Sequence, residues 1–145
     1  MTTVLVANGP NLNRLGTREP EKYGSTTLDE LAAHAMQWGS ELGLEVVVRQ
    51  SNDEAELVSW MHEAVDHGWA VVLNPAAFTH YSYALRDACA LVTTAGGTLI
   101  EVHLTNPHAR EEFRHTSVIS GVATGTIAGL GIDSYRLGLE AIAAR

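Results

Sequence analysis

The strongest constraint on the fold is the alternation of short apolar runs with longer segments of helical periodicity. The apolar runs have the length and composition of buried strands, and we assign them to residues 3–7, 45–49, 70–73, 99–103 and 117–120. Between them, apolar residues recur at every third or fourth position, which is the spacing of one helix face. Strands that alternate with helices form parallel sheets with right-handed crossovers, so the sequence predicts an α/β fold.

Helices are expected between the strands and after the last one. The first covers residues 28–42 and ends at a glycine. The second opens near Asn52 or Asp53 and the third near Ser82, because these short polar side chains can cap a helix N-terminus. The closing helix is expected over residues 124–143, where four glycines require close packing as compensation.

Five strands in a chain of this length favour the flavodoxin-like order 2-1-3-4-5, a five-stranded parallel sheet with helices on both faces. The switch point of this topology lies between the first and third strands, and ligands bind there beyond the carboxyl ends of the strands. Residues 8–24, 74–80 and 101–106 are expected to meet at this point. The first of these segments is too long for a simple turn and is interpreted as a functional loop.

Length and composition limit the domain count and the kind of partner. At 145 residues, the chain is expected to form a single domain over residues 1–145. A net charge of −8, with only scattered arginines, argues against a nucleic-acid partner. No apolar stretch reaches the roughly 20 residues that span a bilayer, and the chain begins directly with a strand pattern, so we expect a cytoplasmic protein without a membrane partner. Cys89 is the only cysteine, and we expect it to be a buried structural thiol.

Motifs of several functions found on similar folds are missing. A Schiff-base mechanism needs a buried lysine, but the only lysine is Lys22, in the long loop. Nucleotide-binding domains carry a Gly-x-x-x-x-Gly-Lys or Gly-x-Gly-x-x-Gly turn after the first strand, and neither is present. A receiver-type signalling domain would have acidic residues after the first strand and an aspartate after the third, where Asn8 and Asn74 stand here.

Seven short segments, in register along nearly the whole chain, carry a family resemblance. They are Asn8-Gly9-Pro10-Asn11-Leu12, Arg18-Glu19-Pro20-Glu21-Lys22-Tyr23-Gly24, Arg49-Gln50-Ser51-Asn52, Asn74-Pro75-Ala76-Ala77-Phe78-Thr79-His80, Ala84-Leu85-Arg86-Asp87-Ala88, Glu101-Val102-His103-Leu104-Thr105-Asn106 and Arg110-Glu111-Glu112-Phe113-Arg114. Together they resemble the type II 3-dehydroquinate dehydratases. The resemblance implies conversion of 3-dehydroquinate to 3-dehydroshikimate, in the shikimate pathway of aromatic amino acid biosynthesis, by anti elimination of water through an enolate. It also implies that no metal or organic cofactor is needed, and that the chain forms a homododecamer built as a tetramer of trimers.

The resemblance implies roles for the residues that act on the reacting atoms. Tyr23 would be the base that removes the proton beside the ketone, with Arg18 as its activator. His103 would be the acid that protonates the departing hydroxyl. Glu101 lies two residues earlier on the same strand face, where it can orient the imidazole. Asn11 would help to hold an ordered water near the enolate.

The resemblance also implies how the substrate is held. The backbone amides of Leu104 and Thr105 would bind the carboxylate. Asn74 would bind the carboxylate or the departing hydroxyl. His80 and Arg114 would bind the ring hydroxyls.

Two further positions and one alternative function remain. The resemblance implies that Asp87 reaches the site of a neighbouring subunit, and that Arg110 adds positive potential near the tyrosine. A non-catalytic oligomeric protein that binds a small acid on the same fold is the alternative. The presence of Arg18, Tyr23 and His103 together argues against it.

Overall fold

The computed structural model describes residues 1–145 except 18, 20, 22 and 23. All strands of its sheet are parallel, in the order β2-β1-β3-β4-β5. The strands are β1 (Thr2–Asn8), β2 (Leu44–Gln50), β3 (Ala70–Asn74), β4 (Leu99–His103) and β5 (Gly125–Ala128). The flavodoxin-like topology is confirmed, and the first four strands agree with the predicted ranges to within one residue at each end.

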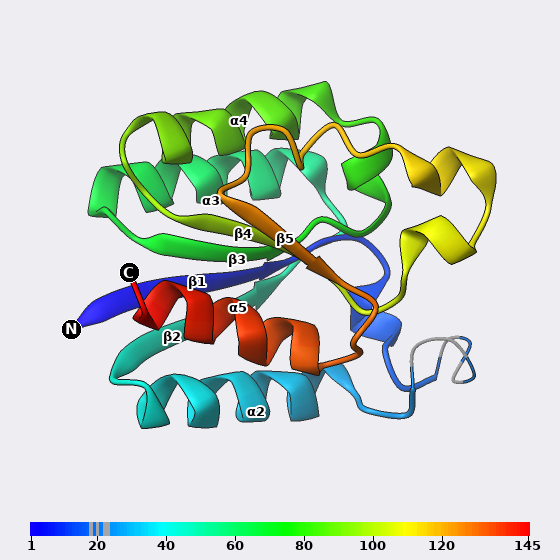
Figure 1. The fold of residues 1–145 in the computed structure, drawn as a ribbon, viewed down its shortest axis with the longest axis horizontal. Helices are drawn as coiled ribbons and strands as arrows, with labels where there is room; N and C mark the ends of the chain where they lie inside the picture. The colour runs from blue at the N-terminus through cyan, green and yellow to red at the C-terminus, as the bar shows by residue number, and fades with distance from the viewer. Residues whose placement is uncertain (18, 20, 22–23) are drawn as a thin grey trace.

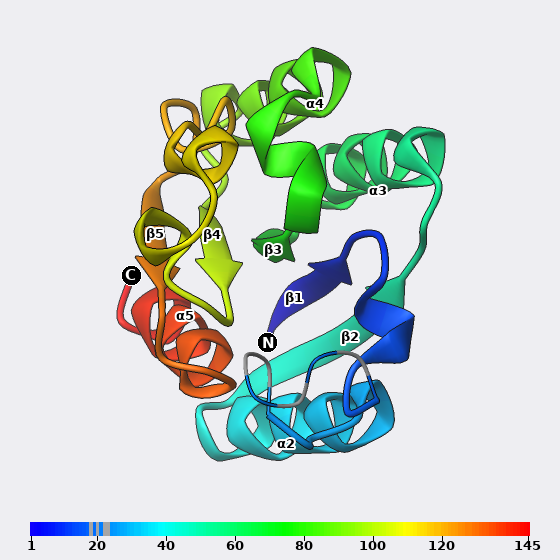
Figure 2. The ribbon, with the colours of Figure 1, turned by 90° about the vertical axis from the view of Figure 1, so that its right-hand side faces the viewer.

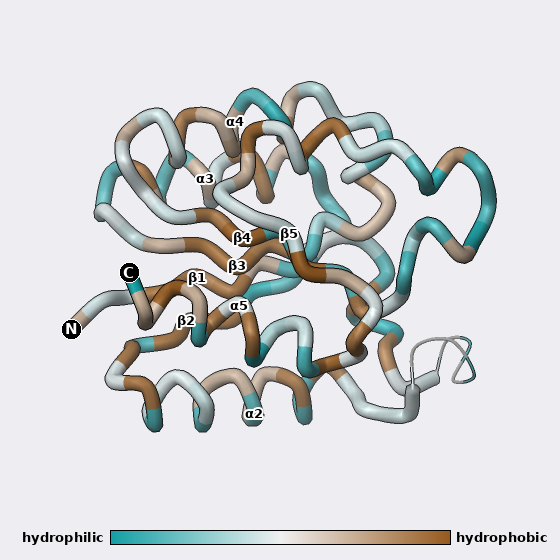
Figure 3. Tube along the Cα trace, viewed as in Figure 1, coloured by the Kyte–Doolittle hydropathy of each residue, from teal (hydrophilic) through white to brown (hydrophobic). Residues whose placement is uncertain are grey.

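Helices cover both faces of the sheet (Figure 1). Those of the described residues are α2 (Leu28–Glu41), α3 (Glu54–His67), α4 (Tyr83–Thr94) and α5 (Asp133–Ala143). Successive residues of β1 point to opposite faces, so Val4 and Val6 pack in the core under α2 and α5, while Leu5 and Ala7 pack under α3 and α4. The central strands are accordingly among the most apolar parts of the chain (Figure 3).

The helix starts follow local capping chemistry. The Asp53 side chain accepts a hydrogen bond from the Ala55 amide, and Ser82 Oγ accepts one from the Leu85 amide, as predicted for these two helices. Short 3₁₀ helices carry the loops at the carboxyl edge of the sheet. They are η1 (Leu12–Arg14), η2 (Ala76–His80), η3 (Pro107–Ala109) and η4 (Glu112–His115).

The predicted fifth strand is wrong in position. Residues 117–120 form a loop with a bend at residues 118 and 119, and β5 lies at Gly125–Ala128, where it pairs with β4. The reason is local hydrogen bonding, because Ser117 Oγ accepts bonds from the amides of Ile119 and Ser120. A serine side chain that binds its own following backbone competes with strand pairing.

The closing helix is also shorter than predicted, because two glycines precede it in conformations that end a helix. Gly129 has φ of 91° and Gly131 has φ of 60°, both in the left-handed region that favours glycine. Gly138 does lie within α5, where an added Cβ would meet the side chains of Val72 and Val102 at 3.4 Å. Close packing therefore compensates for glycine at this position, as predicted.

The single cysteine is confirmed as a buried thiol. Cys89 has no exposed surface, and burial raises its pKa to about 12. Such a thiol stays protonated at neutral pH and packs as a small apolar side chain. In the part of the chain that the structure describes, no helix combines the length and apolar character needed to cross a bilayer.

Candidate active site

One cavity of about 200 Å³ lies at the carboxyl ends of β3 and β4, beside the loop that follows β1, at the edge of the sheet that faces the viewer in Figure 2. Eight of the residues implied by the resemblance line it: Asn11, Asn74, His80, His103, Leu104, Thr105, Arg110 and Arg114. Segments far apart in the sequence therefore meet where the topology predicts a ligand.

A chain of buried hydrogen bonds orients Asn74 at the end of β3. Its Nδ2 donates to the Tyr135 hydroxyl at 2.8 Å, and that hydroxyl donates to Asn8 Oδ1 at 2.6 Å. Asn74 Oδ1 accepts a bond from the Ala76 amide at 3.0 Å. Burial raises the pKa of Tyr135 well above its ordinary value, so the hydroxyl keeps its proton. The side-chain nitrogen of Asn74 carries two hydrogens. The bond to Tyr135 uses one of them, and the two contacts of the side chain fix the direction of the other.

Glu101 is a buried carboxylate that accepts hydrogen bonds from hydroxyl groups. Thr79 Oγ1 donates to Oε2, Ser120 Oγ donates to Oε1 at 2.6 Å, and Ser117 Oγ lies 3.3 and 3.2 Å from the two oxygens. Burial alone raises the pKa of Glu101, but the hydrogen bond and charge of His103 and the bonds from Ser120 and Thr79 outweigh it. The pKa therefore lies below its usual value, and Glu101 is an anion at neutral pH.

The same carboxylate sets the role of each nitrogen of His103. Nε2 of His103 lies 2.6 Å from Oε2 of Glu101. Since an ionised carboxylate can only accept, Nε2 must be the donor in this bond. Nδ1 is then the nitrogen left to exchange a proton with a ligand. His103 lines the cavity, whereas Glu101 lies behind it with no exposed surface.

His80 adds a neutral imidazole to the cavity wall. Its Nδ1 lies 2.8 Å from the carbonyl oxygen of Thr116, which can only accept, so Nδ1 carries the hydrogen and Nε2 is an acceptor. Burial lowers the pKa of His80, and the charges of Arg114 and His103 add to that effect. His80 can therefore accept a hydrogen bond from a ligand hydroxyl at neutral pH.

The backbone after β4 directs two amide groups away from the loop between β5 and α5. The Gly129 amide donates to the His103 carbonyl at 3.2 Å, and the Gly131 amide donates to the Leu104 carbonyl at 2.9 Å. The N–H of a trans peptide points opposite to its C=O, so the N–H groups of Leu104 and Thr105 point away from these glycines. Both residues line the cavity. Successive amides of this kind can bind an anion such as a carboxylate.

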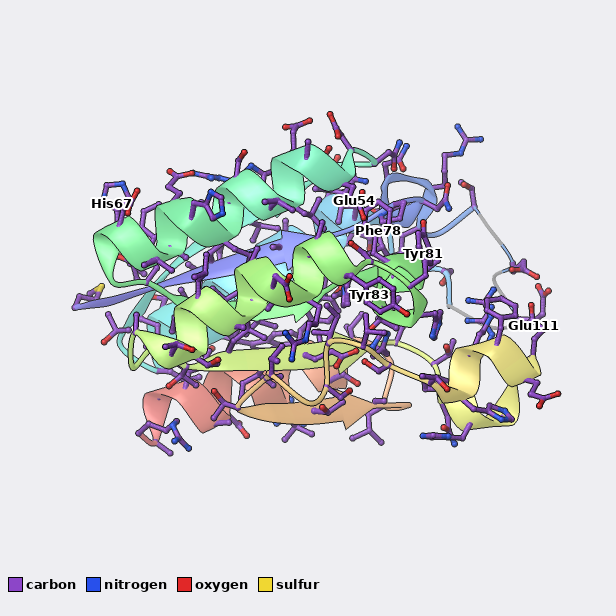
Figure 4. All side chains as sticks on the ribbon, turned by 90° about the horizontal axis from the view of Figure 1, so that it is seen from above. Glu54, His67, Phe78, Tyr81, Tyr83 and Glu111 are labelled. Carbon is purple, nitrogen blue, oxygen red and sulfur yellow. The ribbon has the colours of Figure 1, made fainter. Side chains whose placement is uncertain are left out.

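Two arginines supply positive charge in a chain whose net charge is −8. Arg110 Nη1 donates to Thr105 Oγ1 at 3.2 Å, and Arg114 Nε donates to Glu111 Oε1 at 3.0 Å. Figure 4 shows Glu111 beside the two 3₁₀ helices that follow β4. Both arginine side chains are largely buried at the cavity, where their charges are less screened than on an open surface.

Comparison with known proteins identifies the family. The family model described as dehydroquinase class II matches residues 2–143. The chain belongs to this family. A protein of Salinispora tropica named 3-dehydroquinate dehydratase is 63% identical over 142 residues, which is 98% of this chain and 97% of that protein. A protein of the same name from Corynebacterium pseudotuberculosis is 53% identical over 137 residues, which is 94% of this chain and 93% of the relative.

Solved dehydroquinase structures share the fold. The type II dehydroquinase from Propionibacterium acnes is 50% identical and matches with a TM-score of 0.96, over 100% of this chain and 98% of that one. A 3-dehydroquinate dehydratase-like protein from Bifidobacterium longum is 48% identical with a TM-score of 0.78, over 99% and 97% of the two chains. The sheet order and the family membership therefore agree.

The loop after β1 of this dehydroquinase is described in part. Arg18 and Tyr23, the implied activator and base, lie outside the described residues. Asn11 lies within them, in the left-handed region with φ of 71°. The backbone N–H of Asn11 donates to Asn52 Oδ1 at 2.9 Å, which ties this loop to the segment that follows β2.

Asp87 is the one implied substrate-binding residue that is not at the cavity. It lies on α4 with 72% of its side chain exposed, and its Oδ1 is 2.8 Å from Arg86 Nη1. The structure thus brings together the other implied binding residues and leaves Asp87 on the outer surface of the dehydroquinase subunit.

Four residues that support the dehydroquinase site were missed by the sequence analysis. Thr79, Ser117 and Ser120 hold Glu101, and Tyr135 links the two asparagines at the ends of β1 and β3. The spacing of Ser117 and Ser120 is a turn signal that could have pointed to a non-strand segment. Tyr135 carries no comparable signal, because its hydrogen bond to Asn8 joins residues at opposite ends of the chain.

Proposed function

We propose that this dehydroquinase is a 3-dehydroquinate dehydratase, a hydro-lyase that converts 3-dehydroquinate to 3-dehydroshikimate by anti elimination of water through an enolate. The observation that carries the proposal is the ionised Glu101 hydrogen-bonded to His103 at a cavity lined by arginines and amide groups. Loss of water from a hydroxy ketone that also bears a carboxylate requires a proton donor for the hydroxyl and an anion site. Both lie at this one cavity.

His103 is assigned as the general acid. With Nε2 donating to Glu101, the protonated imidazole carries a second hydrogen on Nδ1, and the buried carboxylate stabilises its positive charge. As the C–O bond of the enolate intermediate breaks, its electron pair stays on oxygen, Nδ1 gives its proton to that oxygen, and water leaves. The electrons of the enolate form the new C=C bond.

The substrate is held by groups that match its functional groups. The backbone amides of Leu104 and Thr105 bind the carboxylate, and Asn74 binds either the carboxylate or the departing hydroxyl. His80 and Arg114 bind the ring hydroxyls, His80 as an acceptor through Nε2. The fixed orientation of Asn74 and the neutral state of His80 support these assignments.

Tyr23 is assigned as the base that takes the proton beside the ketone, with Arg18 as its activator. Both assignments rest on the motif Arg18-Glu19-Pro20-Glu21-Lys22-Tyr23. Asn11 is assigned to hold the water near the developing enolate, and Arg110 adds positive potential at the same cavity.

We also propose that the chain is a single dehydroquinase domain over residues 1–145 that assembles as a homododecamer, a tetramer of trimers. Asp87 would then reach the cavity of a neighbouring subunit, which its exposed position on α4 supports. The enzyme is assigned to the shikimate pathway in the cytoplasm, and to a reaction without metal or organic cofactor. A non-catalytic acid-binding protein would have no need for an ionised glutamate behind His103.

The product of the purified protein tests this proposal. Incubation with 3-dehydroquinate should yield the vinylic proton signal of 3-dehydroshikimate in the NMR spectrum, both with and without a metal chelator. Borohydride added with substrate should not inactivate the enzyme, because no Schiff base forms. A folded protein that yields no vinylic signal would overturn the dehydratase assignment, and loss of activity with chelator would overturn the cofactor-free reaction.

A further inference from the structure

A series of buried hydrogen bonds runs behind the cavity, between the sheet and α5. Its side chains are those of Asn8, Tyr135 and Asn74, and we call it the Tyr135 relay. Asn8 and Asn74 are paired neighbours on β1 and β3, so their side chains lie on the same face of the sheet. The Tyr135 hydroxyl lies between them and contacts both. Of the three residues, Asn74 alone lines the cavity.

Each end of the Tyr135 relay is a backbone group whose role in a hydrogen bond cannot change. At one end, the Arg49 carbonyl accepts a bond from Asn8 Nδ2 at 3.1 Å. At the other end, the Ala76 amide donates to Asn74 Oδ1 at 3.0 Å. A carbonyl oxygen carries no hydrogen, and a backbone amide can only donate. Both asparagine side chains are therefore turned in one direction by the backbone.

The direction of every bond in the relay follows from these two ends. Because Asn8 Nδ2 faces the Arg49 carbonyl, Asn8 Oδ1 faces Tyr135 and accepts its hydrogen. The Tyr135 oxygen then accepts from Asn74 Nδ2. Burial raises the pKa of Tyr135 above its ordinary value, so this hydrogen stays in place at neutral pH. A reversed Asn74 would face the Ala76 amide as a second donor and the Tyr135 oxygen as a second acceptor.

We propose that the Tyr135 relay makes Asn74 a donor only, so that Asn74 binds the ionised carboxylate of the ligand and excludes a carboxamide. Asn8 and Tyr135 are then positioning residues that determine this specificity. The identity of the ligand rests on the proposed function. The groups assigned to the carboxylate, which are Asn74 Nδ2 and the amides of Leu104 and Thr105, are all donors. A ligand NH₂ at this place would meet N–H groups and no lone pair.

The same direction favours the carboxylate over the departing hydroxyl as the partner of Asn74. A hydroxyl has to place its own hydrogen on an acceptor, and the Asn74 acceptor is already turned to the Ala76 amide. A carboxylate offers lone pairs only, at about four positions, which matches a set of donors. A site whose hydrogen-bonding groups pair fully with one ligand discriminates strongly against an analogue that leaves them unpaired.

The relay also holds the turn that follows β3. Ala76 has φ of 51°, in the left-handed region that residues other than glycine rarely adopt, and its amide is bound to Asn74 Oδ1. The 3₁₀ helix η2 begins at this residue and carries Thr79 and His80. A change in the orientation of Asn74 should therefore free the Ala76 amide, which gives a measurement that needs no ligand.

Hydrogen exchange tests the relay in the protein without ligand. Tyr135→Phe removes the hydroxyl and keeps the ring, and the Ala76 amide should exchange faster, by about tenfold or more, in peptides that cover residues 72–80. Leu139→Ala removes a buried side chain one turn farther along α5, and should leave this amide unchanged. Native exchange at Ala76 in Tyr135→Phe would overturn the relay as the support of Asn74.

Calorimetry measures the choice between acid and amide. The probes are quinate, which is 3-dehydroquinate with its ketone reduced to a hydroxyl, and the primary carboxamide of quinate. Native protein should bind the acid more tightly than the amide. Tyr135→Phe should weaken the acid by about tenfold or more, the usual size of a hydrogen bond to a charged group, and change the amide little. A native preference in the folded Tyr135→Phe protein would overturn the proposal.

A native protein that binds neither probe would contradict the proposed ligand and the selection of its carboxylate together. Turnover of 3-dehydroquinate with an unchanged preference in Tyr135→Phe would contradict the selection alone. Exchange at Ala76 shows in either case whether the relay holds Asn74.

Asn8→Leu breaks the relay at its other end and leaves Tyr135 and Asn74 in place. It should reduce the preference for the acid by a factor similar to that of Tyr135→Phe. The double variant should lose no more than either single variant, because both changes interrupt one series of bonds. Leu139→Ala should keep the native preference. Losses that multiply in the double variant would indicate two separate packing defects and would contradict the relay.

Discussion

His103 Nε2 and Glu101 Oε2 lie 2.6 Å apart at the end of β4, with the carboxylate buried behind the imidazole. The two residues are adjacent on one strand face, so the strand itself sets their separation. The buried carboxylate accepts the hydrogen bond from Nε2 and so leaves Nδ1 as the nitrogen that can exchange a proton with a ligand. The first prediction tests this relationship.

Glu101→Gln should lower kcat by about 10²-fold or more while changing KM little, because the amide keeps the shape of the side chain but not its charge. The substrate-binding groups of the cavity remain in place. Steady-state kinetics of the purified variant give both constants. A rise in KM with kcat unchanged would show that Glu101 serves ground-state binding rather than the proton donor.

Ser120→Ala removes the 2.6 Å hydrogen bond to Glu101 Oε1 and should reduce the free energy of unfolding by about 1–3 kcal/mol at pH 7. The pKa of Glu101 is lowered in the folded protein, so its ionisation stabilises the fold above the unfolded-state pKa, and this contribution is lost as the pH falls through the folded-state pKa. The difference between variant and native protein should therefore shrink in acid.

Denaturant unfolding at neutral and acidic pH measures that difference. Ser40→Ala, at an exposed position of α2, is the control and should change the unfolding free energy little at either pH. An effect of Ser120→Ala that is the same at both pH values would indicate a packing defect instead of lost support for an anion.

His80→Ala should raise KM by about tenfold, equivalent to roughly 1.4 kcal/mol, with a smaller effect on kcat, because a hydrogen-bond acceptor for the substrate is lost. His34→Ala changes an exposed histidine that stacks on Trp38, and should change neither constant. Measurement of kcat and KM for both variants under the same conditions tests this prediction. Equal losses in both would point to a general effect on folding.

Tyr23→Phe should be nearly inactive and Asp87→Ala should bind substrate weakly, yet a mixture of the two should recover activity after subunit exchange. If each cavity takes Tyr23 from one chain and Asp87 from its neighbour, random mixing leaves roughly a quarter of the sites intact. Activity measured before and after reassembly of the mixture gives this fraction. Mixtures that stay inactive after exchange has been shown by mass would place both residues of a site on one chain.

The strands and helices that could be predicted are those with a strong local signal, either a continuous apolar run or a capped helix start. β1, β3 and β4 are apolar on both faces, and the capped starts at Asp53 and Ser82 are local, so sequence alone places them closely. β5 is short and alternates half-buried with exposed residues, which is a weak signal beside the serine-rich turn before it. The prediction failed at residues 117–120 because Ser117 Oγ accepts hydrogen bonds from the amides of Ile119 and Ser120, which competes with strand pairing.

The residues of the site also divide into those that the sequence could place and those that it could not. Residues on the carboxyl ends of the strands and on the loops after them could be placed at one edge from topology, and the resemblance named which of them matter. The residues that hold Asn74 and Glu101 in place could not be found in this way. Tyr135 contacts Asn8 and Asn74 only because α5 returns across the sheet, and Thr79 meets Glu101 through the η2 turn.

The absorbance of the conjugated enone after addition of 3-dehydroquinate tests the central claim most directly, with native protein and His103→Ala followed side by side. The account predicts a steady rise with the native chain and a rate lower by about 10² to 10⁴ in the variant, the usual loss when a general acid is removed. A folded native protein that produces no enone, or a variant that produces it at the native rate, would contradict the account.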